Sequence, residues 1–228
     1  MKTIFKRTST HLLIATLAAG MGVHLASLAQ STPADTGQVV ITGSISASTC
    51  SVNVSDPGST TTTGNGSKSL FLGNNAATNG TLASTFGTPV AAMFTLGNAT
   101  TPSSACVLQG GATAWDLSLG LTPAQITTIS GSTLGTTTFL KNSINSGGTD
   151  AVVVLKGGVA ASPAAATAAS ATNFLTLKGD GLGLLSGGTA GATSTGALVL
   201  TAQWVRSAAS APTPGQYSQT IPLTVLYK

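Results

Sequence analysis

The stretch Tyr217-Ser-Gln-Thr-Ile-Pro-Leu-Thr-Val-Leu-Tyr227 decides the fold, because its apolar side chains recur at every second position. An extended strand points successive side chains to opposite faces, so a period of two predicts a strand with one buried face. The same alternation runs through Val39–Ile45, Trp115–Leu121 and Leu198–Val205. These four segments predict a protein built mainly from β-strands.

Shorter apolar segments between Gly- and Asn-containing stretches add further candidate strands. They are Cys50–Val54, Leu70–Leu72, Met93–Leu96, Thr136–Lys141, Ala151–Leu155, Phe174–Lys178 and Leu182–Leu185. The best helical candidate, Ala160–Ala171, contains Pro163 and has no apolar stripe, so we expect a loop or at most one helical turn. Many short strands with turns between them predict an all-β sandwich.

The composition argues against most enzyme classes. The chain has 228 residues, with nine Lys and Arg, two His and five acidic residues, all of them Asp. Both histidines, His11 and His24, lie near the N-terminus, in a segment that reads as a leader. General acid–base catalysis, Ser–His–Asp triads and transition-metal sites lack their usual side chains beyond that segment. We therefore expect no enzyme, no cofactor and no metal site, and the small net charge predicts no nucleic-acid partner.

The first 29 residues have the pattern of a secretory signal peptide. Lys2, Lys6 and Arg7 precede the mostly apolar stretch Leu12–Val23, and Ser27-Leu28-Ala29 forms a small-x-small cleavage site. No later stretch reaches the roughly 18 apolar residues of a membrane span, so we predict no transmembrane helix. Export to an oxidising compartment favours one disulfide between Cys50 and Cys106, which would stabilise the fold by about 4 kcal/mol.

The two ends of the exported chain carry the functional information. Gln30–Thr36 is small and polar, and it leads into Gly37-Gln-Val-Val-Ile-Thr-Gly43, in which Gly37, Val39 and Ile41 share one face of a strand. One interpretation is an ordinary first strand with a loose terminus. The other is a mobile strand that pairs elsewhere, because an open sheet edge at the C-terminal strand would accept a strand from another copy. Head-to-tail donation of this kind generates filaments.

With these features the chain resembles the major pilins of the chaperone–usher pathway, the family of type 1 and P fimbriae. Gly215 is fourteenth from the C-terminus and Tyr227 is penultimate, as in that family. Gly43-Ser-Ile45 precedes Cys50 as the family's Gly-x-Val precedes its first cysteine, and Phe94-x-Leu96 precedes Cys106. The sequence departs from the family in its wider cysteine spacing, its extra Thr-, Ala- and Gly-rich loops, and Asp35 at a donor position.

The resemblance implies an incomplete immunoglobulin-like sandwich that is completed by a donor strand from a neighbouring subunit. It divides the chain into a signal peptide (1–29), an N-terminal donor-strand extension (30–43) and a pilin domain (44–228). The implied donor residues are Gly37, Val39 and Ile41. The implied residues of the groove and chaperone-binding strand are Gly215, Tyr217, Ile221, Leu223, Val225 and Tyr227.

The expected function is that of a structural, non-enzymatic subunit of a surface fimbria that supports adhesion. Its expected partners are identical or related pilin subunits, a periplasmic chaperone, an outer-membrane usher, and a host or surface receptor. The expected location is the cell surface, reached through the periplasm. The alternatives are a minor, adaptor or adhesive pilin, and an archaic, spore-coat-like secreted pilin.

Overall fold

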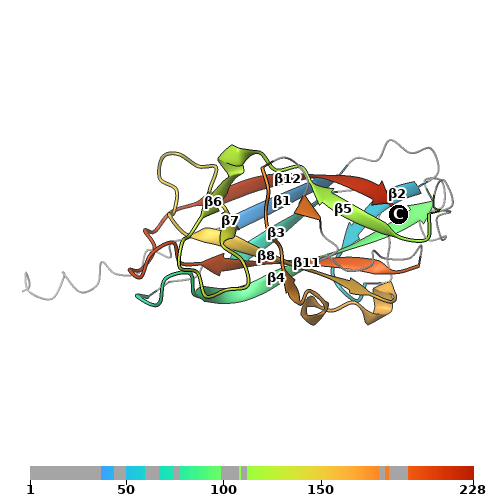
Figure 1. Cartoon of the computed structure of the whole chain (residues 1–228), viewed down its shortest axis with the longest axis horizontal. Coiled ribbons are helices and arrows are strands. Elements are labelled where there is room, and N and C mark those ends of the chain that lie inside the picture. Colours follow the sequence, from blue (N-terminus) through green and yellow to red (C-terminus); the bar gives the residue numbers. More distant parts are fainter. Residues whose placement is uncertain are drawn as a thin grey trace, which may run out of the picture. The chain divides into compact units, whose positions relative to one another are not determined.

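Two β-sheets pack face to face, as the period-two pattern predicts. The structure is a computed structural model that describes residues 37–43, 50–59, 67–73, 78–98, 108, 112–179, 183–184 and 195–228. Figure 1 shows the two sheets, and the prediction of an all-β, immunoglobulin-like sandwich is confirmed. The predicted signal peptide and residues 30–36 of the predicted extension lie outside the described residues.

The first sheet has the strand order β10-β5-β12-β1-β3. Its strands are β1 (Gly37–Gly43), β3 (Ser67–Gly73), β5 (Trp115–Leu119), β10 (Gly183–Leu184) and β12 (Tyr217–Tyr227). The second sheet has the order β2-β4-β11-β8-β7-β6, and β9 pairs with β8. Its strands are β2 (Cys50–Ser55), β4 (Thr85–Asn98), β6 (Ile126–Thr128), β7 (Thr138–Leu140), β8 (Val152–Ala160), β9 (Asn173–Phe174) and β11 (Ala197–Val205).

The main hydrophobic core lies between the two sheets. It joins inward side chains of the first sheet to inward side chains of the second. Members from the first sheet include Ile41 and Leu117, and members from the second include Phe94 and Leu200, each of them 0% exposed. The alternating segments therefore do what their period predicts, because every second side chain enters this core.

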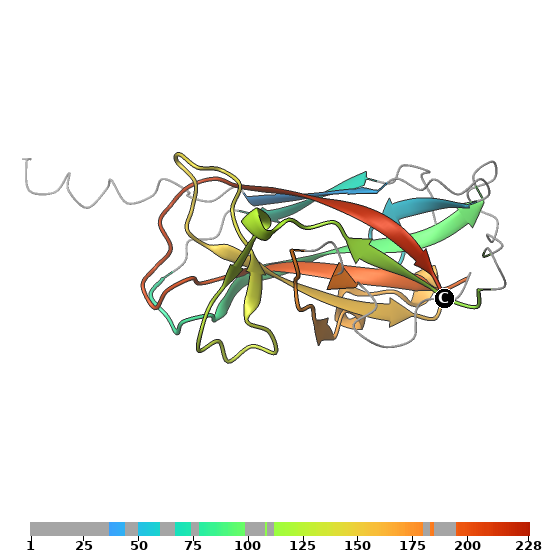
Figure 2. The same ribbon diagram turned by 45° about the horizontal axis from the view of Figure 1, so that its top comes forward.

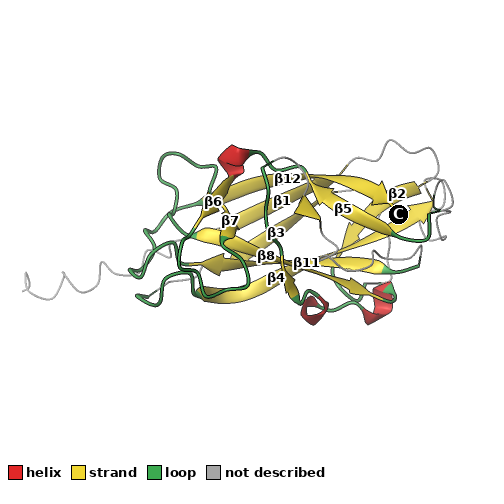
Figure 3. Cartoon of the chain, viewed as in Figure 1, coloured by secondary structure: helices red, strands yellow, loops and turns green. Residues whose placement is uncertain are grey.

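The second sheet is also covered on its outer face. Met93, Ala160, Ala166, Ala171 and Val199 form a separate buried cluster there. Ala166 and Ala171 lie beside the 3₁₀ turns η4 (Pro163–Ala165) and η5 (Ala168–Ser170), which are red in Figure 3. The prediction of a loop with at most one helical turn over residues 160–171 is therefore close, since two such turns are found. A third turn, η3 (Pro123–Gln125), precedes β6.

Some strands differ from their predicted extents. β9 and β10 contain only two residues each, and β6 was not predicted because Ile126-Thr-Thr128 is too short to show alternation. No helix among the described residues is long and apolar enough to cross a membrane. Cys50 is 3% exposed and disulfide-bonded, and its predicted partner Cys106 lies outside the described residues.

Candidate functional site

The first strand lies in the interior of the first sheet, between the last strand and β3. β1 runs parallel to β12, with Gly37 level with Tyr217 and Gly43 level with Leu223. On its other side it runs antiparallel to β3, where Val39 is level with Leu70. Figure 2 shows blue β1 beside red β12. We call the space between β12 and β3 that β1 fills the groove.

The three predicted donor residues all face into the groove. Val39 and Ile41 are 0% exposed and belong to the main core, whereas the alternating Gln38 and Val40 are only half-buried. The groove is therefore filled in this single chain by the chain's own N-terminal segment. Burial of apolar side chains stabilises a fold by about 25 cal/mol per Å², so Val39 and Ile41 are major contributors to holding β1 in place.

Gly37 is required by the close approach of Trp204. A Cβ atom added to Gly37 would lie 2.6 Å from Cη2 and 3.2 Å from Cε2 of the indole ring. Contacts below 3.0 Å are essentially never found for real Cβ atoms. The ring therefore occupies the volume that any other side chain at position 37 would need.

The Trp204 ring is fixed on several sides. It stacks on Phe86 with ring centroids 6.0 Å apart and meets Tyr217 edge-on at 5.1 Å. Its Nε1 donates a hydrogen bond of 3.3 Å to the carbonyl oxygen of Leu72 on β3. Trp204 on β11 thus contacts both strands that border the groove, and it cannot move aside without breaking these contacts.

The predicted groove residues follow β12 as expected, with burial that decreases along the strand. Tyr217, Ile221 and Leu223 are at most 3% exposed, whereas Val225 and Tyr227 are half-buried and pack against the same core. The sixth predicted residue, Gly215, precedes β12. Its added Cβ would lie 2.6 Å from backbone atoms of Gly148 and Thr149, so this glycine allows two backbone segments to approach closely.

Tyr217 connects the two sheets. Its hydroxyl donates a hydrogen bond of 3.2 Å to the carbonyl oxygen of Leu140 on β7, and the side chain is 2% exposed. Burial raises the pKa of the Tyr217 phenol well above its ordinary value of 10.0. Burial also raises the pKa of Tyr227, which is less enclosed. Both phenols therefore disfavour the charged form in the folded protein.

This burial predicts a loss of stability in alkali. Above pH 10 an unfolded tyrosine releases its proton while folded Tyr217 keeps it, so the folded state binds more protons. The free energy of unfolding should be constant for this group below pH 10. Above pH 10 it should fall by about 1.4 kcal/mol per pH unit. Urea unfolding between pH 8 and pH 12 measures this slope.

The matched variant is Tyr217→Phe, which removes the titrating group and keeps the ring. It should lose about 1 kcal/mol at pH 8 with the hydrogen bond, and it should show a clearly shallower decline above pH 10. Equal slopes for the two proteins would contradict the assignment of the alkaline loss to Tyr217.

The end of β12 is clamped to β5. The carbonyl oxygen of Lys228 accepts hydrogen bonds from the backbone nitrogens of Thr113 and Ala114, at 2.8 and 3.2 Å. The Lys228 ammonium forms an ion pair with Asp116, whose side chain is 0% exposed. A buried carboxylate needs such a partner, because an unpaired buried charge destabilises a fold strongly. These contacts hold the C-terminal end of β12 against the start of β5.

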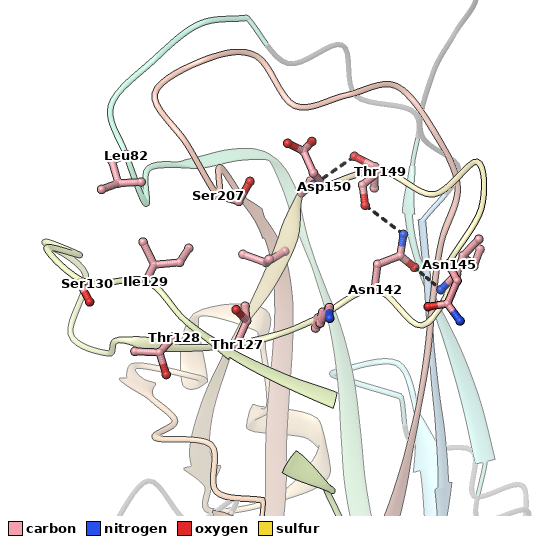
Figure 4. Close-up of a pocket in the computed structure, with 14 residues that line it drawn as sticks. Leu82, Thr127, Thr128, Ile129, Ser130, Asn142, Asn145, Thr149, Asp150 and Ser207 are labelled. Carbon is pink, nitrogen blue, oxygen red and sulfur yellow. Dashed lines mark hydrogen bonds between the residues drawn. The ribbon is translucent and has the colours of Figure 1, made fainter. Parts of the chain in front are cut away.

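A polar cleft of about 670 Å³ lies near the other end of β12. Figure 4 shows its side chains, among them Thr127, Ser130, Asn145 and Asp150. Asn142 in this cleft donates from Nδ2 to the carbonyl oxygen of Gln216 at 2.6 Å, and its Oδ1 accepts from the Ser218 nitrogen at 3.1 Å. Asn142 thereby ties the β7–β8 connection to the start of β12.

The charged side chains that line the cleft belong to Lys141 and Asp150. Asp150 is its carboxylate, and Oδ1 of that group accepts a hydrogen bond of 2.5 Å from the Thr213 nitrogen. Over the residues that the structure describes, no group of three or more His, Cys, Asp or Glu side chains is placed to hold a metal ion. The best-defined candidate functional site is therefore the groove.

The sequence patterns did not indicate the part that three residues play at the groove. Trp204 entered the sequence analysis only as part of the alternating segment Leu198–Val205, although it sets the size limit at position 37. Gln219 and Asn142 were not singled out. The alternation of Tyr217, Gln219 and Ile221 could have flagged Gln219, because it places a polar residue on the inward face.

No family model matches the chain, and a search of curated proteins finds no significant sequence match.

Proposed function

We propose that this protein is a structural subunit of a surface fimbria that polymerises by donor-strand exchange. The observation that carries the proposal is the position of β1. A segment from the N-terminal side of the domain fills an interior place in the first sheet, between β12 and β3. The same place can be taken by a strand from another subunit, identical or related.

Strand exchange between subunits would produce an open-ended series of contacts. When the donor strand of one subunit, identical or related, enters the groove of the next, the contacts that Val39, Ile41 and Gly37 make here are replaced by equivalent contacts between subunits. Each copy then gives one strand and receives one, and such a heterologous contact builds a filament rather than a closed dimer. The exchange needs no cofactor and no catalytic residue.

The proposed partners and location follow from the groove and from the signal-peptide pattern of the first 29 residues. A chain with an empty groove exposes core side chains and two unpaired strand edges, which promotes aggregation. A periplasmic chaperone that lends a strand would protect it, and an outer-membrane usher would replace that strand with the extension of the next subunit. The proposed location is the cell surface, and the proposed role in adhesion includes contact with a host or surface receptor.

The test is a gel of the sheared cell-surface fraction, loaded either unheated in SDS or after boiling in acid. We expect a ladder of multimers in the unheated lane that collapses to one band near the mature mass after acid. Deletion of residues 30–43 should abolish the ladder. Gln38→Ala, on the half-buried outward face of β1, should preserve it and serves as the control.

The outcome that contradicts the proposal is equally definite. Self-occupation of the groove favours a second candidate, a self-contained secreted sandwich, because the chain can complete its own sheet. That candidate predicts a single monomer band in both lanes from cells that export the protein.

A further inference from the structure

The wall of the groove contains one buried amide that its present occupant leaves unpaired. Gln219 lies on the inward face of β12, between the core residues Tyr217 and Ile221, and is 1% exposed. Its Nε2 has no hydrogen-bond partner. A buried N–H donor without an acceptor destabilises the state that contains it. Gln219 is therefore a polar position in an otherwise apolar wall.

The residue that faces Gln219 cannot supply the acceptor. Val39 is level with Gln219 in the parallel pairing and is 0% exposed. Neighbouring residues on the same face of paired strands have their Cβ atoms about 5 Å apart. Val39 presents only methyl groups at that place, so the chain's own strand leaves the amide donor unpaired.

A reversed strand from a second copy would not remove the mismatch. The inward positions of β1 are Gly37, Val39, Ile41 and Gly43, so either end could place a glycine beneath Trp204. With Gly43 level with Tyr217, an antiparallel strand would bring Ile41 to Gln219. If instead Gly37 were level with Tyr217, an antiparallel strand would bring Asp35 level with Gln219. Val39 and Ile41 would then lie beyond the first residue of β12 and outside the groove. Each alignment that keeps both aliphatic residues in the groove leaves the amide facing one of them.

We propose that Gln219 is the specificity-determining residue of the groove, and that it selects a donor strand with a hydroxyl-bearing residue, threonine or serine, at the facing position. The preferred donor is therefore a strand from a different subunit, not a second copy of this chain. Threonine has nearly the shape of valine, so it fits the space that Val39 fills. Its hydroxyl can accept from Nε2 or donate to Oε1, so it satisfies the amide in either orientation. This inference rests on the proposed strand exchange.

The first test is a double-mutant cycle in the full mature chain, which does not depend on polymerisation. The substitutions are Val39→Thr and Gln219→Leu, and the readout is the urea midpoint of unfolding. A buried threonine without a partner normally lowers the midpoint. We expect Val39→Thr to leave the midpoint unchanged or raise it when Gln219 is present, and to lower it clearly in the Gln219→Leu background. Equal decreases in both backgrounds would overturn the inference.

The second test is a competition between two peptides for the groove of the mature chain. One peptide has the sequence of residues 37–43, and the other is identical except for Val39→Thr. We expect the threonine peptide to be incorporated with at least about tenfold preference into the natural chain, and the preference to reverse in the Gln219→Leu chain. A preference for the valine peptide in both chains would identify a second copy as the natural donor and overturn the inference.

The two tests separate this inference from the proposed function. If neither peptide enters and the surface fraction gives no ladder, strand exchange fails, and the mutant cycle alone decides the preference of Gln219. If the ladder forms and the cycle shows no coupling, the fibre proposal stands and the role of Gln219 is refuted.

Discussion

A chain that begins at Ser44 is expected to lose its cooperative fold. It lacks β1, so Val39 and Ile41 no longer fill the core, and β12 and β3 are left with unpaired edges. Loss of a single buried side chain such as Ile41 typically costs about 2 to 5 kcal/mol. Two such losses, together with the hydrogen bonds of β1, approach the whole stability of a domain, which is about 5 to 15 kcal/mol.

The measurement is recovery of the fold in trans. The truncated chain is refolded with and without a synthetic peptide of residues 37–43, and the near-UV circular dichroism of its tryptophans is recorded. We expect a native signal only with the peptide. A control peptide with Ile41→Asp should not restore it, because a carboxylate would be buried in the core. A truncated chain that unfolds cooperatively without any peptide would refute the role assigned to β1.

The second large effect is expected from Gly37→Leu. The Trp204 ring lies where the new side chain must go, and it is held by Phe86 and Tyr217. Overpacking a core usually costs about 1 to 3 kcal/mol. At this site the Cβ atom itself collides with the ring, so we expect the upper end of that range or more. Equilibrium unfolding in urea measures the change.

Val40→Leu is the matched control for this prediction. It adds apolar bulk to the same strand, but on the outward and half-buried face. Surface substitutions of this kind usually change stability by less than about 0.5 kcal/mol. A Gly37→Leu chain as stable as the Val40→Leu chain would mean that the indole does not limit what position 37 can hold.

The fold could be predicted from the sequence where a strand has one buried face. β12 alternates cleanly, since its outward residues are half-buried or exposed, and β1 does so over residues 37–41. β5 alternates only in polarity, because all five of its residues are buried. β4 was predicted only over Met93–Leu96, whereas it begins at Thr85. Gly87 has a φ of +67°, and the pairing with β11 shifts between Ala202 and Trp204. Such an irregularity interrupts the period of two, so local patterns cannot reveal the strand.

The inward face of β1 could be predicted from the sequence, but the strands it pairs with could not. Alternation and the family resemblance identified Gly37, Val39 and Ile41, and all three face the groove. The parallel direction of β1 and the contact of Gly37 with Trp204 depend on segments far apart in the sequence. The missing amide partner of Gln219 depends on the register of two strands, which no single segment specifies.

The pairing of β1 with β12 also determines the order of events during biosynthesis. β1 is the first strand of the domain to be made and β12 is the last, so their contacts have a very large sequence separation. Pairing between distant segments is slow, because the intervening chain must be ordered before the contacts form. Every newly made molecule therefore passes through a period in which β12 has no neighbour on the β1 side. During that period the edge of β12 on the β1 side has unpaired backbone groups, which are the groups that a strand from another protein would need for pairing.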